Sequence, residues 1–508
     1  MPSSTQGSVS TDNAPDIRNG HPDGRAPLPS APPDLASREM CCAAHLHPAL
    51  AAQVLLHYSA DNPRAWCPSF GVDVVALVRH AQAANAHWRS LYSAVAFIRF
   101  TLIALIALGA LLLGLGGLAT VLLSLPLIAV IYGVGWRTTY RSLQQTRAAA
   151  VETMVEGADL AHQVVKVDAD LEEDLAVLQA ANIIAFSVDA ESPFVGSGTE
   201  VGRWALPPID VSRRGGKTDD GTPPPTPFSI RELHDYLIRI ARSRLGLENI
   251  EIEKRLYVRG DVLPECDGLL SPDDLRPLPR VDDYWVDLGS DAPGEQARTY
   301  VCLAKSLVGG EIVVTLFARC TLQQSVLSCE FAAYVLPPVL RMSARSTDFG
   351  GVFGENLGPL HGRSIERALA IAAWRTFAAE LFLRSDRGVD LAEAHEERMV
   401  EQYQALEEGR RYDYGAPYSV RELASTSSID SYFEMVDVRD CLLRMQRGAV
   451  DCLMAFLDEK GIDTSEIAEG RQRIINNITN IGEVSGTGNI FGHHGRVANS
   501  YRDDQSDE

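Results

Sequence analysis

The sequence predicts a membrane-anchored α+β protein: a two-helix transmembrane hairpin, a cytoplasmic α+β domain with a mainly antiparallel sheet, and C-terminal helices. Three observations predict this class. No charged residue occurs between Arg99 and Arg137, and ~18 or more apolar residues in a row are typical of a bilayer span. Short apolar, strand-like runs follow from about residue 182 to 340. Apolar residues at helical spacing then dominate from about 364 to 460.

The uncharged run is too long for one upright span. At ~1.5 Å per residue, a helix through it would far exceed a hydrocarbon core of ~30 Å. Gly114, Gly116 and Gly117 lie near its middle, and glycine favours a tight turn. We therefore expect a membrane turn at these glycines, between the spans Ser93–Leu113 and Leu118–Trp136. One tilted span is the alternative.

Positive charge flanks both ends of this run. No Asp or Glu occurs between Asp73 and Glu152. The flanking residues nearest the membrane are Arg89, Arg99, Arg137 and Arg141. Arginine on both sides predicts a cell-membrane protein with both termini and the large C-terminal body in the cytoplasm. A single span would place that body outside.

Composition limits the partners. The net charge is −21, so an acidic body should be repelled by nucleic acid, and we expect no nucleic-acid partner. The nine cysteines form no C-x-x-C pair, which is typical of buried thiols in a reducing compartment. The spacing of Cys and His matches no metal site, so no metal and no cofactor are expected.

Changes in composition divide the chain into seven expected units. Pro-, Ser- and Gly-rich segments mark disorder, and shifts in apolar spacing mark the other boundaries. The units are a disordered tail (1–38), a helical collar (39–92), the transmembrane hairpin (93–136), a helical stalk (137–180), the α+β domain (181–345), a helical region (346–461) and an Asn/Gly-rich tail (462–508).

Local signals place several elements. Gly309-Gly310 predicts a hairpin turn between two strands. Ser229 with Glu232, and Ser419 with Glu422, form two predicted capping boxes that begin helices. A strand is also expected from Trp204 to Val211.

A glycine-rich loop is the best candidate for a functional element. Its candidate ligand-binding residues are Gly196, Ser197, Gly198, Thr199 and Gly202, because glycines let backbone N–H groups approach a phosphate. Known phosphate loops lead into a helix, whereas this one leads into a strand and has no P-loop lysine. A structural turn is therefore the alternative, and no catalytic residue is assigned.

Four segments resemble a family of uncharacterised actinobacterial membrane proteins. They are Ser192–Gly202, Leu327–Pro338, Tyr412–Leu423 and Phe456–Thr464. The resemblance covers most of Met40 to Asn499. It implies a membrane location and no particular activity.

The sequence favours a membrane-anchored scaffold or regulatory protein that contacts the lipid bilayer and either binds a protein partner or self-associates. One alternative is a pore-forming or stress effector acting through the glycine-rich hairpin. A second is an enzyme or ligand-binding module that uses the loop at 192–202.

Overall fold

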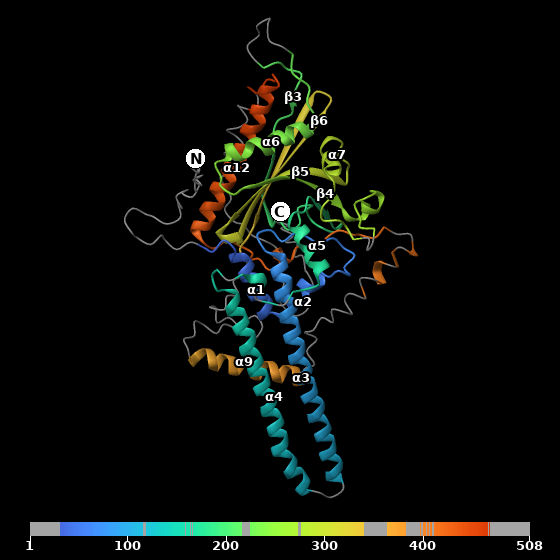
Figure 1. The fold of residues 1–508 in the computed structure, drawn as a ribbon, viewed down its shortest axis with the longest axis vertical. Coiled ribbons are helices and arrows are strands. Elements are labelled where there is room, and N and C mark those ends of the chain that lie inside the picture. Colours follow the sequence, from blue (N-terminus) through green and yellow to red (C-terminus); the bar gives the residue numbers. More distant parts are fainter. Residues whose placement is uncertain are drawn as a thin grey trace, which may run out of the picture.

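The computed structural model describes residues 31–114, 118–157, 159–162, 164, 166–215, 224–272, 276–339, 363–382, 411–465 and 467, with scattered positions between 397 and 408. Two long helices extend from a body that contains a sheet (Figure 1). Most of the expected N-terminal tail and nearly all of the expected C-terminal tail lie outside the described residues, as do Gly116 and Gly117.

The body is built on a seven-stranded mixed sheet in the order β1-β4-β5-β6-β7-β2, with β3 paired to β7. The strands are β1 (Ile183–Phe186), β2 (Thr199–Ala205), β3 (Ile209–Asp210), β4 (Glu251–Arg259), β5 (Ala297–Leu307), β6 (Ile312–Gln323) and β7 (Val326–Leu336). Among these seven strands, β1 and β4 alone pair in parallel. This confirms the expected α+β class with a mainly antiparallel sheet.

Two turns in the sheet follow local chemistry. Gly309 and Gly310 both have positive φ, at 63° and 87°, and they connect β5 to β6 as predicted. The strand expected from Trp204 to Val211 is instead split between β2 and β3. Pro207 and Pro208 separate the two pieces, because proline has no N–H to donate to the ladder.

Helices cover one face of the sheet, and aromatic rings cover the other. On the first face, α6 (Ile230–Leu245) and α12 (Tyr432–Glu459) pack over β4, β5 and β6 (Figure 1), and side chains of β7 join the same core. On the second, Phe194 stacks on Phe317 with ring centroids 4.0 Å apart. The prediction for the start of α6 is correct in part: Ser229 Oγ accepts a hydrogen bond from the Glu232 N–H.

A helical base joins the sheet to the two long helices. The other helices are α1 (Leu35–Leu46), α2 (Pro48–His57), α3 (Val74–Gly114), α4 (Leu118–Thr153), α5 (Ala169–Gln179), α7 (Asp283–Asp291), α9 (Arg363–Phe382) and α11 (Val420–Leu423). Side chains from α1, α2, α5 and the proximal parts of α3 and α4 share one apolar core. Short 3₁₀ turns occur at Leu160–His162, Gly260–Glu265 and Val308–Gly310.

The long helices continue from the base outward without a break. The last part of the expected collar, from Val74, and the first span form one helix, α3, since no proline or glycine interrupts it before Gly109. The expected second span likewise continues past Trp136 to Thr153. Gly114 is the last residue of α3. One described helix, over Val74–Leu111, is long and apolar enough to cross a membrane by length and composition.

Helix α9 crosses the two long helices away from the body (Figure 1). Gly135 of α4 permits the close approach, because a Cβ there would lie 2.4 Å from the Phe377 ring. Trp136 Nε1 donates to the carbonyl of Ala370, at 3.3 Å. The Tyr132 and Phe377 rings meet edge to face, with centroids 5.0 Å apart.

Replacing Gly135 with leucine should loosen α9. The new side chain overlaps the Phe377 ring, and overpacking of this kind costs about 1–3 kcal/mol. Hydrogen exchange of residues 363–382 in the full-length chain should therefore accelerate. Gly133→Leu is the matched control, because nothing lies within 4 Å of its Cβ position. Equal exchange in both variants would contradict this packing.

Candidate functional site

Three of the four segments singled out in the sequence meet at one place, which we call the junction. It consists of the loop at Gly196 and Gly198, the end of β7 with Pro337, and Arg421 and Glu422 of α11. The fourth segment, at the end of α12, lies elsewhere, where Ile462 bridges to Arg214. The junction therefore joins parts of the chain that are far apart in sequence.

The carboxylate of Glu422 occupies the glycine loop. Its Oε1 accepts hydrogen bonds from the Gly196 N–H at 2.9 Å and the Gly198 N–H at 2.8 Å. Both glycines have positive φ, at 89° and 84°, which turns their N–H groups toward one point. The loop is thus an anion-binding nest, and a carboxylate of the same chain fills it.

Neither glycine has room for a side chain. A Cβ on Gly198 would lie 2.3 Å from the carbonyl oxygen of Val335. A Cβ on Gly196 would lie 3.0 Å from Cys67 Sγ. The loop is pressed between β7 and the segment that precedes α3, so it acts as a packed connector.

Arg421 fixes the other side of the junction. Its guanidinium is fully buried and donates to the carbonyls of Glu311, at 2.6 Å, and Pro337, at 2.9 Å, and to the hydroxyl of Ser425. Burial lowers the pKa of Arg421 to about 10, so it remains charged at neutral pH. It ties α11 to the residue before β6 and the residue after β7, at the open end of this hairpin.

The prediction that the Ser419 side chain caps the helix beginning there is wrong. Ser419 makes no side-chain capping hydrogen bond at the start of α11. Glu422 reaches the nest instead, while a hydrogen bond from the Ser419 backbone also contributes to its pKa. The residue Glu422 as a whole is half-buried, whereas its carboxyl group is surrounded by protein. Burial raises its pKa to about 7, and the three backbone hydrogen bonds oppose that rise.

The thiol and imidazole beside the nest are arranged for packing. Cys67 is fully buried, and burial raises the pKa of its thiol well above the usual value, which disfavours a nucleophilic thiolate. The Cys67 N–H donates to His57 Nε2 at 3.1 Å, so this ring nitrogen is already used as an acceptor. Among the described residues, no group of three His, Cys, Asp or Glu side chains could hold a metal ion.

The other candidate loop residues have separate environments. Ser197 is buried, and its Oγ has no hydrogen-bond partner among the described residues. Thr199 begins β2 and pairs with Val335. Gly202 lies at a register shift of β2 with open space beside it, away from Glu422. Ligand binding by this loop stays a prediction; the structure brings only Gly196 and Gly198 to a shared anion.

The membrane-flanking arginines lie on the long helices. Arg89, Arg137 and Arg141 are exposed, and Arg99 is half-buried with its guanidinium carbon 5.8 Å from the centre of the Phe100 ring. These positions are compatible with contact to lipid headgroups.

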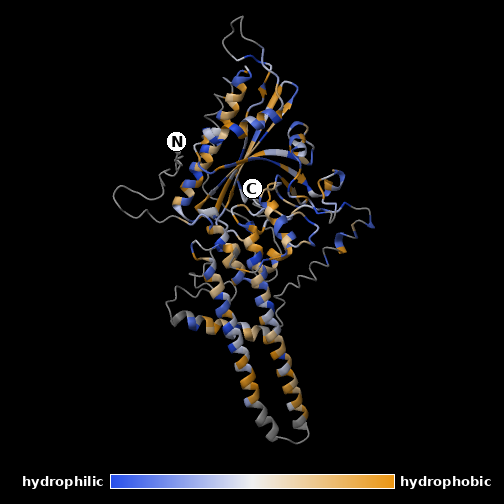
Figure 2. Cartoon of the chain, in the orientation of Figure 1, coloured by the Kyte–Doolittle hydropathy of each residue, from blue (hydrophilic) through white to orange (hydrophobic). Residues whose placement is uncertain are grey.

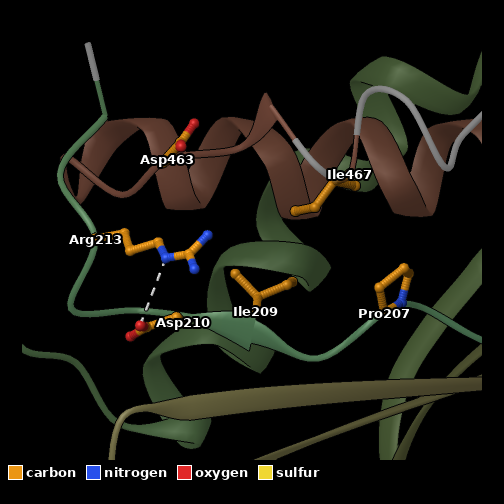
Figure 3. Close-up of a pocket in the computed structure, with 6 residues that line it drawn as sticks. All are labelled: Pro207, Ile209, Asp210, Arg213, Asp463 and Ile467. Atoms are coloured by element: carbon orange, nitrogen blue, oxygen red, sulfur yellow. Dashed lines mark ion pairs between the residues drawn. The ribbon is translucent and has the colours of Figure 1, made fainter. Parts of the chain in front are cut away.

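The cavity in Figure 3 is too small for a ligand. It lies between β3 and the chain after α12, and its volume is about 10 Å³. Such a volume accommodates roughly one water molecule. Arg213 and Asp210 face each other there, with Nε and Oδ2 3.7 Å apart. A wider groove of about 290 Å³ between α6 and α12 is lined by charges that already pair, such as Lys460 with Glu232.

Gly198→Ala should destabilise the full-length chain by more than about 2 kcal/mol. Alanine is strained at positive φ, and its methyl group would meet the Val335 carbonyl. Thermal and denaturant unfolding would measure the change. The matched control is Gly202→Ala in the same segment, which has open space and should change stability by less than about 0.5 kcal/mol. Similar losses in both variants would refute the packing at Gly198.

Glu422→Gln should remove part of the pH dependence of stability. The folded-state pKa of Glu422 is raised from 4.5 to about 7, so its contribution is complete below about pH 4.5 and is lost as pH rises through 7. Glutamine stays neutral and keeps an oxygen that accepts both N–H bonds. Allowing for partial exposure, we expect the variant to gain on the order of 1–2 kcal/mol relative to the parent between pH 5 and 8. If the free energies of unfolding of the variant and the parent change in parallel with pH across that range, Glu422 does not titrate as described.

Comparison with known proteins gives one finding. A family model described as "AbeC-like domain" matches residues 203–491, which is more than half of the chain. No curated protein and no solved structure matches the sequence.

Proposed function

The chain belongs to the AbeC-like domain family, and from its exposed apolar helices we propose that it is a membrane-anchored scaffold or regulatory protein. In this proposal α3 and α4 form a transmembrane hairpin, and the body carries the interaction with a partner or a second copy. The resemblance to actinobacterial membrane proteins goes beyond the family match and forms part of the proposal.

The apolar surface of the distal long helices carries the proposal. The exposed side chains lie between 49% and 73% accessible, on both helices: Phe97, Phe100, Ile103, Ile106, Leu108, Leu111, Leu127, Val130 and Val134. Figure 2 shows that apolar residues predominate along the parts of both long helices that lie farthest from the body. Burying one such side chain is worth about 1.5–3 kcal/mol, so water is an unfavourable solvent for this surface. Lipid acyl chains would cover this surface and remove it from water.

The alternative that α3 is a core helix of a soluble protein fits the structure less well. Only 11% of the most apolar window of α3 is buried. A core helix of a soluble protein can be equally long and apolar, but it is mostly buried. The low burial supports contact with a bilayer.

The junction supports an interaction role over a catalytic one. Glu422 Oε1 and the terminal nitrogens of Arg421 already bond groups of the same chain, and the nest is filled. Such an arrangement holds remote segments in one rigid body. A rigid body at a membrane suits a protein that presents a surface to others.

The pore-forming alternative uses small residues of the hairpin to pack copies together. Gly133 is open, whereas Gly135 is already covered by Phe377 of α9. An intact membrane potential on overexpression would remove this alternative.

Membrane fractionation tests the anchor. The full-length chain should stay in the membrane pellet after alkaline extraction. Leu108→Glu places a charge on the exposed surface of α3 and should shift protein to the supernatant, because a charge near the bilayer centre costs about 2.5–3.5 kcal/mol. Tyr432→Glu, an exposed residue on the body, is the control and should remain in the pellet.

A soluble, monodisperse full-length chain without detergent would overturn the anchor. Reporter fusions at the C-terminus address its orientation separately. A reporter active only in the cytoplasm should work, and activity only from an exported reporter would end the hairpin topology.

A further inference from the structure

We propose that α9 is an interfacial helix that lies along the membrane surface and inserts Ile371 and Trp374 at the boundary between lipid headgroups and acyl chains. The inference rests on the proposed membrane anchor and specifies it. It adds a third membrane-contacting element that the apolar run in the sequence does not reveal, since α9 carries charges.

The first support is the level at which α9 crosses. The Cβ position of Gly135 lies 2.4 Å from Phe377 of α9 and 3.3 Å from Ile98 of α3. Gly135 and Ile98 are therefore at the same height along the two long helices. The charge-free run begins at that height, since the nearest charges are Arg99 and Arg137. Helix α9 thus lies where headgroups would meet hydrocarbon.

The second support is the direction of α9. Figure 1 shows it running across α3 and α4, not along them. If the long helices cross a bilayer, a helix at this angle lies roughly in the plane of its surface. That is the usual orientation of an amphipathic interfacial helix.

The third support is the outward face of α9. Ile371 and Trp374 are 44% and 54% exposed, whereas Ala373 and Phe377 are buried against the long helices. Ile371 and Trp374 lie three residues apart and share a face. Tryptophan favours the membrane interface, because its ring is apolar and its N–H can stay in the wet layer.

The exposed apolar pair is continuous with the proposed lipid-facing surface. Trp136 donates to the Ala370 carbonyl at 3.3 Å, so an interfacial tryptophan of α4 is bonded directly to α9. Exposed Phe97 on α3 lies one residue from Ile98, at the level of the crossing. Arg367 on α9 is also exposed and is suited to anionic headgroups. The lipid surface is therefore the occupant that fits this face.

Spin labelling of the full-length chain in liposomes tests the proposal. A nitroxide is attached at Trp374→Cys, and its accessibility to oxygen, which dissolves in lipid, is compared with that to a water-soluble nickel complex. Leu108→Cys reports the proposed span, and Tyr432→Cys reports the body in water. The unsubstituted chain is the blank, because all its described cysteines except half-buried Cys266 are buried.

The measured quantity is the ratio of oxygen accessibility to nickel accessibility. We expect this ratio at position 374 to be at least threefold higher than at position 432 and to approach the ratio at position 108. A label at 374 that matches 432 while 108 is lipid-exposed would overturn the interfacial helix and leave the anchor standing. Water exposure at both 108 and 374 would overturn the anchor and α9 together. Ile371→Cys gives the same readout if labelling at 374 disturbs the fold.

Discussion

The hydrogen bonds from Gly196 and Gly198 to the Glu422 carboxylate constrain how three distant segments of the body meet. They connect the loop before β2 to α11, while Arg421 on the same short helix binds the carbonyls that flank β6 and β7. Charge-assisted bonds of this kind are stronger than neutral ones, and here they offset part of the cost of burying the carboxylate. The two neighbouring residues of α11 thus fix the position of the loop before β2 relative to the open end of the β6–β7 hairpin.

The same contact changes the meaning of the glycine loop. A nest of N–H groups binds an anion whatever its source, and sequence alone does not say whether the anion is a ligand or an internal carboxylate. Glu422 lies more than two hundred residues away, and its position near Ser419 suggested a local cap instead. The loop was recognisable from its glycines; its occupant required the three-dimensional fold.

Local patterns predicted the elements whose chemistry is local. Gly309-Gly310 marked the turn between β5 and β6, and Ser229 marked the start of α6. The break between β2 and β3 is a local effect, because Pro207 and Pro208 interrupt an otherwise strand-like run from Trp204 to Val211. Other features depend on contacts between residues far apart in the sequence, or on a helix that runs on without interruption. The crossing of α9 over Gly135 could not be read from composition, because each partner has an ordinary sequence.

The continuity of α3 has a mechanical consequence. It is one helix of 41 residues, ~60 Å long, whose proximal part is built into the helical base through side chains such as Leu77 and Trp88. There is no flexible tether between base and tip. Once embedded as proposed, the body would sit at a nearly constant height and orientation, with little freedom to move away from the bilayer. Any partner would then have to reach it by lateral diffusion or be delivered to that height, which favours neighbours attached to the same bilayer.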